Sequence, residues 1–271
     1  MWSAVVIASC RYRTAEHIGY RQATAYLTGN AGELYRDRGD FEEAQRHFSA
    51  GLRAAIDIGD WITTVRCTAA LAMTAADQGV AGHRDLLRRA CDIAGQLHQS
   101  YVLADVLLRR AEAAFDDGDA TGALPLARQA ETAAWRLAER GPTLRPHLLR
   151  LRIEVALGRT GVAQASREIA DMVPEWPDPP ERALLLDTLA QIDPAAQAPA
   201  REAAALYREL YGAAPSRQFA TAYRRLTGGC TDLPPATPLP RLAAEVADGP
   251  VDLDHLFTRV ERLAAAAPVL P

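Results

Sequence analysis

Apolar and polar residues alternate along most of the chain with the period of an α-helix. In the stretch AGELYRDRGDFEEAQRHFSAGLRAAIDIGD, residues 31–60, small and apolar residues recur every three or four positions on both sides of Gly39-Asp40. This pattern predicts two amphipathic helices joined at that glycine, and Asp40 with Glu43 has the spacing of a capping box at the start of the second helix. A single hairpin of this size cannot bury its own apolar face, so it has to pack against neighbouring elements.

The same hairpin pattern recurs further along the chain. Sliding residues 31–60 along the sequence brings Gly39 onto three further glycines, Gly79, Gly118 and Gly158, at intervals of 39 or 40 residues. Repeats of this length are typical of stacked helical hairpins. Ala, Leu, Arg and Glu dominate the composition, only 6% of residues are aromatic, and β-branched residues form no alternating runs. The sequence therefore predicts an all-α fold.

Certain residues of the first copy resemble the small and aromatic positions of the tetratricopeptide repeat family: Gly32, Tyr35, Gly39, Phe41, Ala44 and Phe48. The later copies depart from the pattern, because Arg88 and Ala127 occupy the position of Phe48. The period of 39 or 40 is similar to that of long repeats in bacterial regulators. The resemblance covers about residues 1–212 and implies a right-handed superhelical solenoid of stacked antiparallel hairpins.

Five segments are expected on this basis. They are a half-repeat helix (1–20), a solenoid of four clear hairpins and a divergent fifth (21–212), a closing helix (213–229), a proline-rich linker (230–240) and a C-terminal helical cap (241–271).

The divergent fifth hairpin is expected over residues 181–191 and 194–211. Asp193-Pro194 is interpreted there as the N-cap and first-turn proline of the second helix. In the C-terminal cap, residues 251–267 form an amphipathic pattern whose apolar face we expect to pack back on the repeats, with a detachable docking helix as the alternative. That face carries Leu253, Leu256, Phe257, Val260 and Leu263.

The half-repeat at the start suggests an uncovered apolar end. Residues 3–19 align with the second helix of the first hairpin, so Val5, Val6 and Ile7 would lie at the end of the solenoid. Exposed apolar surface is unfavourable. We expect a partner subunit or the upstream part of a longer parent protein to cover it, with a second copy of the chain as the alternative.

Composition excludes several functions. All 30 basic residues are arginine, so the lysine of a phosphate-binding loop or a Schiff base is impossible. We find no HExxH, GxSxG or glycine-rich phosphate loop, and predict that the chain is not an enzyme and uses no cofactor. The four cysteines and six histidines form no zinc spacing, so no metal site is expected.

Charge and hydropathy narrow the class of partner. A formal net charge of −4 argues against nucleic acid, which normally requires a basic surface. No apolar run reaches the length of a membrane span, and MWSAVVIASC lacks the basic start of a signal peptide. We therefore expect no membrane association and a cytoplasmic location.

The tetratricopeptide resemblance implies a concave groove lined by the first helix of each hairpin. The residues at its lining positions are Tyr26, Glu33, Arg36, Asp37, Arg66, Met73, Asp77, Asp105, Glu112, Phe115, Asp116, Arg145, Arg152 and Val155. Mixed charges with two aromatic residues suit a protein or peptide partner. The expected function is a protein-interaction scaffold or sensor of a bacterial regulatory or multi-component system. The alternative is a small-molecule inducer-binding arm of a bacterial transcription regulator or signal-transduction ATPase.

Overall fold

The computed structural model describes residues 21–137, 141–230, 232–235 and 252–266. Within these residues the chain forms twelve α-helices, one short 3-10 helix and no strand, so the predicted all-α class is confirmed. Contacts between Cα atoms divide the chain into two compact units. Residues of the expected half-repeat, including Val5, Val6 and Ile7, lie outside the described residues.

Unit 1 contains the described residues up to Arg110 together with the C-terminal helix, and unit 2 contains the described residues from Ala111 to 235. The boundary falls inside α6 (Ser100–Asp116). The other helices of unit 1 are α2 (Arg21–Arg38), α3 (Phe41–Ile58), α4 (Trp61–Asp77), α5 (His83–Gln96) and α13 (Leu253–Ala266). Those of unit 2 are α7 (Ala120–Trp135), α8 (Gly141–Ala156), α9 (Val162–Met172), the 3-10 helix η1 (Val173–Glu175), α10 (Pro179–Ile192), α11 (Gln197–Ala213) and α12 (Arg217–Leu226).

Each of the four predicted hinges lies between two helices. The hinge glycines all have a positive φ, between 65° and 86°, and they are Gly39, Gly79, Gly118 and Gly158. This left-handed conformation ends a helix at little cost for glycine alone. After the first hinge, the Asp40 carboxylate caps α3 by accepting a hydrogen bond from the Glu43 backbone N–H at 3.4 Å. The predicted capping by Asp40 is therefore confirmed.

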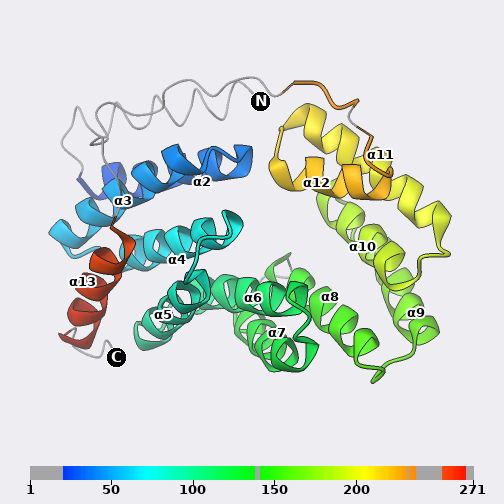
Figure 1. Cartoon of the computed structure of the whole chain (residues 1–271), viewed down its shortest axis with the longest axis horizontal. Coiled ribbons are helices and arrows are strands. Elements are labelled where there is room, and N and C mark those ends of the chain that lie inside the picture. The colour runs from blue at the N-terminus through cyan, green and yellow to red at the C-terminus, as the bar shows by residue number, and fades with distance from the viewer. Residues whose placement is uncertain (1–20, 138–140, 231, 236–251, 267–271) are drawn as a thin grey trace. The chain divides into compact units, whose positions relative to one another are not determined.

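Consecutive helices of unit 1 pack side by side in the order α2, α3, α4 and α5, and α2 also contacts α4 (Figure 1). The core contains Phe48 and Leu52 of α3 and Leu71 of α4, each at most 1% exposed. Arg88 of α5, at the position that corresponds to Phe48, is exposed and forms ion pairs with Asp85 and Asp92. The second hairpin thus replaces an aromatic core residue with a solvated arginine.

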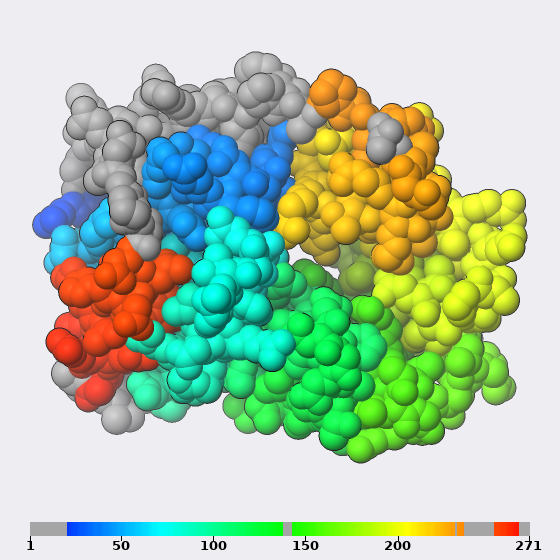
Figure 2. Space-filling model, in the orientation of Figure 1, coloured from blue at the N-terminus to red at the C-terminus, as the bar shows by residue number. Residues whose placement is uncertain are grey.

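The C-terminal helix α13 packs against α5 and α4, and both the ribbon and the space-filling view show it beside them, in red (Figures 1 and 2). Of the apolar face expected from the sequence, Leu256, Phe257 and Val260 are buried, at 7%, 0% and 0% exposed. Burying such a face stabilises the folded chain by roughly 25 cal/mol for each Å² of apolar surface removed from water.

Unit 2 has two clusters of buried side chains. One joins α8, α9 and α10 and includes Leu148, Ile169 and Leu185; the other joins α10, α11 and α12 and includes Leu186, Tyr207 and Tyr223. Because α10 contributes Leu185 to one cluster and Leu186 to the other, it is covered on two faces. This explains why its apolar residues are not confined to a single face.

The structure corrects the start of α11. Residues 194–211 were expected to form this helix with Pro194 in its first turn, but α11 begins at Gln197 and its N-cap is Ala196. Asp193 instead ends α10, and its carboxylate accepts a hydrogen bond from the Ala195 backbone N–H. The Asp-Pro pair therefore forms a turn between two helices, a role that these residue types also favour. The closing helix, α12, spans Arg217–Leu226, inside the expected 213–229.

Candidate binding face

The predicted groove residues lie on α2, α4, α6 and α8, which are alternate helices along the chain. Several of these residues contact one another between successive helices of this set. In unit 1 they belong to α2, α4 and the first part of α6, which we call the unit 1 face. In unit 2 they belong to the last part of α6 and to α8, which we call the unit 2 face.

An arginine stacked on an aromatic ring joins α2 to α4 in the unit 1 face. The guanidinium carbon of Arg66 lies 4.5 Å from the ring centroid of Tyr26. Its Nη2 donates a hydrogen bond of 2.8 Å to the side-chain oxygen of Asn30, one turn further along α2. Tyr26 remains 45% exposed. The pair therefore presents a fixed cation and an accessible aromatic edge together.

Next to this pair lies a half-buried acidic and basic cluster. Arg36 forms an ion pair with Glu33, with 3.0 Å between Nη2 and Oε2. Burial raises the pKa of Glu33, against the opposing charges of Arg36 and Arg66, while Asp37 and Asp105 raise it further. Nη1 of Arg36 is buried and has no hydrogen-bond partner among the described residues. The cluster thus keeps a donor that its own acids do not use.

The remaining predicted residues of unit 1 lie further along α4. Asp77 forms an ion pair with Arg109 of α6. Met73 is half-buried one turn before Asp77. Arg109 was not among the predicted residues, although it lies one turn after Asp105 on the same helix.

The unit 2 face repeats the stacked arrangement. The guanidinium carbon of Arg152 in α8 lies 5.3 Å from the ring centroid of Phe115 in α6. Arg145, two turns earlier on α8, forms an ion pair of 3.2 Å with Glu112. Both pairs join residues that the sequence assigned to one face. Val155 lies on α8 and packs against the buried cluster of α8, α9 and α10, so it faces the core rather than a groove.

Arg152 differs from the other arginines of this face because it forms no ion pair or hydrogen bond with the part of the chain that the structure describes. Burial lowers its pKa, while the charges of Asp116, Glu112 and Asp187 oppose that shift. Its side chain is held by the Phe115 ring, and its five N–H groups remain available to a ligand.

The sequence reasoning missed an acidic residue and its partners next to this face. Asp187 of α10 is only 4% exposed. Nη2 of Arg225 in α12 lies 2.5 Å and 2.6 Å from its two carboxylate oxygens, and the hydroxyl of Tyr207 donates to Oδ2 at 3.3 Å. Burial, together with the charge of Asp187, raises the pKa of Tyr207. The signal was present as a single acid in the apolar run ALLLDTLA.

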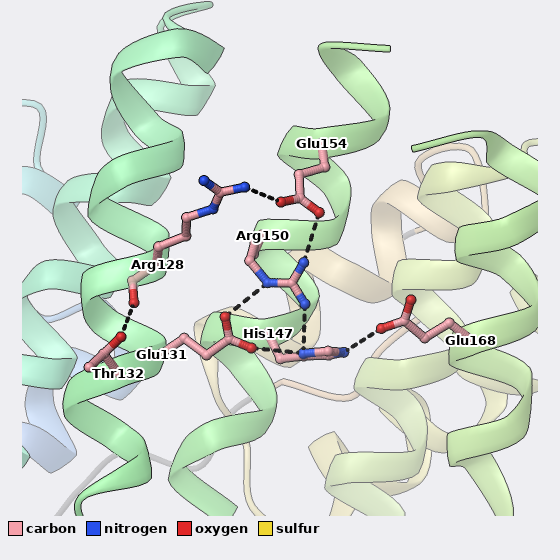
Figure 3. A network of polar contacts seen from close by, with 7 residues as sticks. All are labelled: Arg128, Glu131, Thr132, His147, Arg150, Glu154 and Glu168. Carbon is pink, nitrogen blue, oxygen red and sulfur yellow. Dashed lines mark hydrogen bonds and ion pairs between the residues drawn. The ribbon is translucent and has the colours of Figure 1, made fainter. Parts of the chain in front are cut away.

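A second unpredicted network joins α7, α8 and α9 (Figure 3). Arg150 donates to Glu131 at 2.8 Å and to Glu154 at 2.7 Å, and His147 lies between Glu131 and Glu168 at 2.9 Å and 3.1 Å. Burial of Glu131 opposes its ionisation, but the hydrogen bond from His147 and the charge of Arg150 outweigh burial and lower its pKa. Arg128 completes the network on Glu154. Since every member pairs with another, the network holds three helices together.

Comparison with known proteins assigns the chain to no family, because no protein-family profile and no curated protein matches the sequence. Among the described helices, none has both the length and the apolar character needed to cross a membrane. Within the same residues, no three His, Cys, Asp or Glu side chains gather where they could hold a metal ion.

Proposed function

We propose that this chain is a protein- or peptide-binding scaffold or sensor of a bacterial regulatory system, and that its partners bind on the unit 1 and unit 2 faces. The observation that carries the proposal is the repeated stacking of an arginine on an aromatic ring of the preceding alternate helix. It occurs as Arg66 on Tyr26 and as Arg152 on Phe115.

Such a pair suits recognition of an extended chain or a helix. Stacking fixes the plane of the guanidinium, so less conformational entropy is lost when its N–H edge binds a carboxylate or a carbonyl oxygen. The aromatic ring beside it supplies apolar contact, and arginine and aromatic side chains are the residues that most often dominate binding energy at protein interfaces. We infer that an acidic residue of the partner binds to Arg152, whose donors are unpaired within the described residues.

The architecture that we propose is a right-handed tetratricopeptide-like solenoid. Its support is the series of helical hairpins joined by glycines 39 or 40 residues apart, together with the packing of consecutive helices within each unit. A cytoplasmic location and the absence of catalytic activity belong to the same proposal. The alternative, an inducer-binding arm, would require a single closed pocket for a small molecule, lined by apolar groups with a few convergent polar groups.

Paired substitutions test the proposal. The full chain would serve as bait in a lysate of its host, and the affinity of the captured partner would be measured for Arg66→Ala and Arg152→Ala. We expect each to weaken binding by roughly tenfold or more, because a charged hydrogen bond to a partner is lost. Helical circular dichroism and melting should change little, since a partly exposed cation–π contact contributes only about 0.5–1 kcal/mol to folding.

Arg88→Ala is the matched control, because Arg88 is exposed and pairs only within α5. Affinity that is unchanged in both face variants, or that falls equally in the control, would contradict binding at these faces. A captured small molecule in place of a protein would support the inducer-binding alternative.

A further inference from the structure

The contact between α13 and α5 has the form of a helix bound in a receptor site. Four side chains of α13 meet one residue of α5, Arg89. They are Asp254, Phe257, Thr258 and Glu261, which occupy positions i, i+3, i+4 and i+7 and so form one stripe along the helix. Recognition of an amphipathic helix through such a stripe is a recurring mode of peptide binding.

Arg89 uses all three of its side-chain nitrogens on this stripe. Nη1 donates to Asp254 at 2.5 Å, Nε donates to Glu261 at 2.6 Å, and Nη2 donates to Glu261 at 3.0 Å and to Thr258 at 3.1 Å. Its guanidinium carbon lies 5.3 Å from the ring centroid of Phe257, which is fully buried. The paired hydrogen bonds to Glu261 supply directional as well as electrostatic attraction.

The two sides of this contact differ in burial. The Arg89 side chain is 10% exposed, whereas those of Asp254 and Glu261 are 84% and 40% exposed. These values apply with α13 in place, and α13 itself covers the guanidinium. We take α5 as the receptor and α13 as its ligand because four side chains of α13 converge on this one arginine.

Arg89 also has no partner within its own helix. The neighbouring Arg88 is exposed and pairs with Asp85 and Asp92 of α5, but every hydrogen bond that Arg89 forms with the described residues goes to α13. Without α13 the guanidinium would have no hydrogen-bond partner among the described residues. Its donors would then be open to the carboxylates of another helix.

We propose that the Arg89 surface of α5 and α4 is a binding site for acidic amphipathic helices, which α13 occupies as an internal competitor. The external ligand is a helix of another protein with a carboxylate, an aromatic residue three positions later and a second carboxylate seven positions later. This site lies on α5 and does not depend on the proposed function of the unit 1 and unit 2 faces.

The tether decides how strongly α13 competes. Residues 227–252 connect α12 to α13, so α13 binds α5 within the same chain, and intramolecular binding corresponds to an effective concentration of about a millimolar. An external helix of equal affinity binds only when it exceeds that concentration, or when the internal contact is weakened. The internal helix therefore sets the concentration that an external helix must exceed in order to bind.

A trans-binding experiment on the full chain tests this proposal. The probe is a fluorescent synthetic peptide with the sequence of residues 252–266, and its binding is followed by fluorescence anisotropy. The receptor is the wild-type chain or a full chain with the double substitution Phe257→Ala and Glu261→Gln, which weakens the internal helix. We expect the peptide to bind the double variant at least about tenfold more tightly than the wild type, because the competitor is weakened.

Two controls locate the site. Adding Arg89→Gln to the double variant should abolish peptide binding, whereas adding Arg88→Gln should leave it unchanged. A peptide that carries Asp254→Asn and Glu261→Gln should bind at least about tenfold more weakly than the unmodified peptide, since both charged hydrogen bonds are lost.

Three outcomes would overturn the proposal: no peptide binding to a double variant that keeps its helical circular dichroism, equal binding to the wild type and the double variant, or equal effects of Arg89→Gln and Arg88→Gln. If the double substitution unfolds the chain, the single substitution Glu261→Gln takes its place. The same ranking of affinities is then expected, and its absence contradicts the proposal.

Discussion

The aromatic ring of Phe48 in α3 lies directly against the backbone of Gly32 in α2. A Cβ atom placed on Gly32 would lie 2.7 Å from Cδ1 and Cε1 of that ring, closer than such atoms can approach. Phe48 is itself only 1% exposed. The absence of a side chain at Gly32 is therefore what allows the two helices to approach this closely.

The first prediction follows from this contact. Gly32→Ala should destabilise the chain by about 1–3 kcal/mol, because the overpacking outweighs the better helix propensity of alanine. Gly95→Ala is the matched control, since a Cβ at that position in α5 meets no atom within 4 Å. It should be stabilising by roughly 0.5–1 kcal/mol. Urea denaturation measures both changes, and effects of the same sign would refute the packing argument.

The second prediction concerns the turn between α5 and α6. His98 is exposed there and has a φ of 53°, whereas Gly59, in the corresponding turn between α3 and α4, has a φ of 70°. A left-handed backbone costs a residue with a Cβ about 1–2 kcal/mol. His98→Gly should therefore raise the free energy of unfolding by about 1 kcal/mol, and Gly59→His should lower it by a similar amount. A destabilised His98→Gly variant would show that the histidine side chain contributes contacts that outweigh this strain.

The third prediction is a loss of stability at mildly acidic pH. His47 is 3% exposed and stacks on Tyr35 with 5.0 Å between ring centroids. Burial, assisted by the charge of Arg46, lowers the pKa of His47 to about 4. The folded state therefore favours the neutral ring, and its contribution is fully present above the unfolded pKa of about 6.5. This contribution falls as the pH drops from about 6.5 to 4, with a slope approaching 1.4 kcal/mol per pH unit.

Urea unfolding at several pH values between 7 and 4 measures this slope. His47→Phe should remove the part of the slope that is due to His47, and His255→Gln, on the exposed side of α13, should retain it. The difference between the two variants isolates His47 from the carboxylates that titrate in the same experiment. Parallel curves for the two variants would contradict the prediction.

The features that the sequence predicted correctly depend on residues close together in the chain. The glycine hinge at Gly39, the cap at Asp40 and the apolar face of α13 each follow from a few neighbouring positions. The Asp193-Pro194 pair was misassigned because its residue types favour a helix start and a turn equally well. The local sequence pattern could not distinguish a helix start from a turn.

The contacts that the sequence did not reveal join separate helices. Arg88 and Arg89 are adjacent and chemically identical, yet one is solvated and the other is buried against α13. Whether each arginine is buried or solvated depends on which acidic residues lie opposite it in the folded chain. The periodicity of the sequence does not specify those acidic residues. The same holds for Asp187 with Arg225, and for the network around Arg150. Within the predicted faces, the helical period could assign each residue to one side of its helix. It could not distinguish Arg145, which forms an ion pair, from Arg152, which forms none within the described chain.

The contact of Arg89 with α13 also has a consequence for the order of folding. The hydrogen-bonded pairs between helices of the unit 1 and unit 2 faces join residues 32 to 36 positions apart, whereas Arg89 and Asp254 are separated by 165 positions. In a flexible chain, closing the longer loop costs roughly 1.4 kcal/mol more. We therefore expect the early hairpins to form first and α13 to dock last. During synthesis on the ribosome, α5 emerges long before α13, and in that interval the Arg89 site is open to the helices of other proteins.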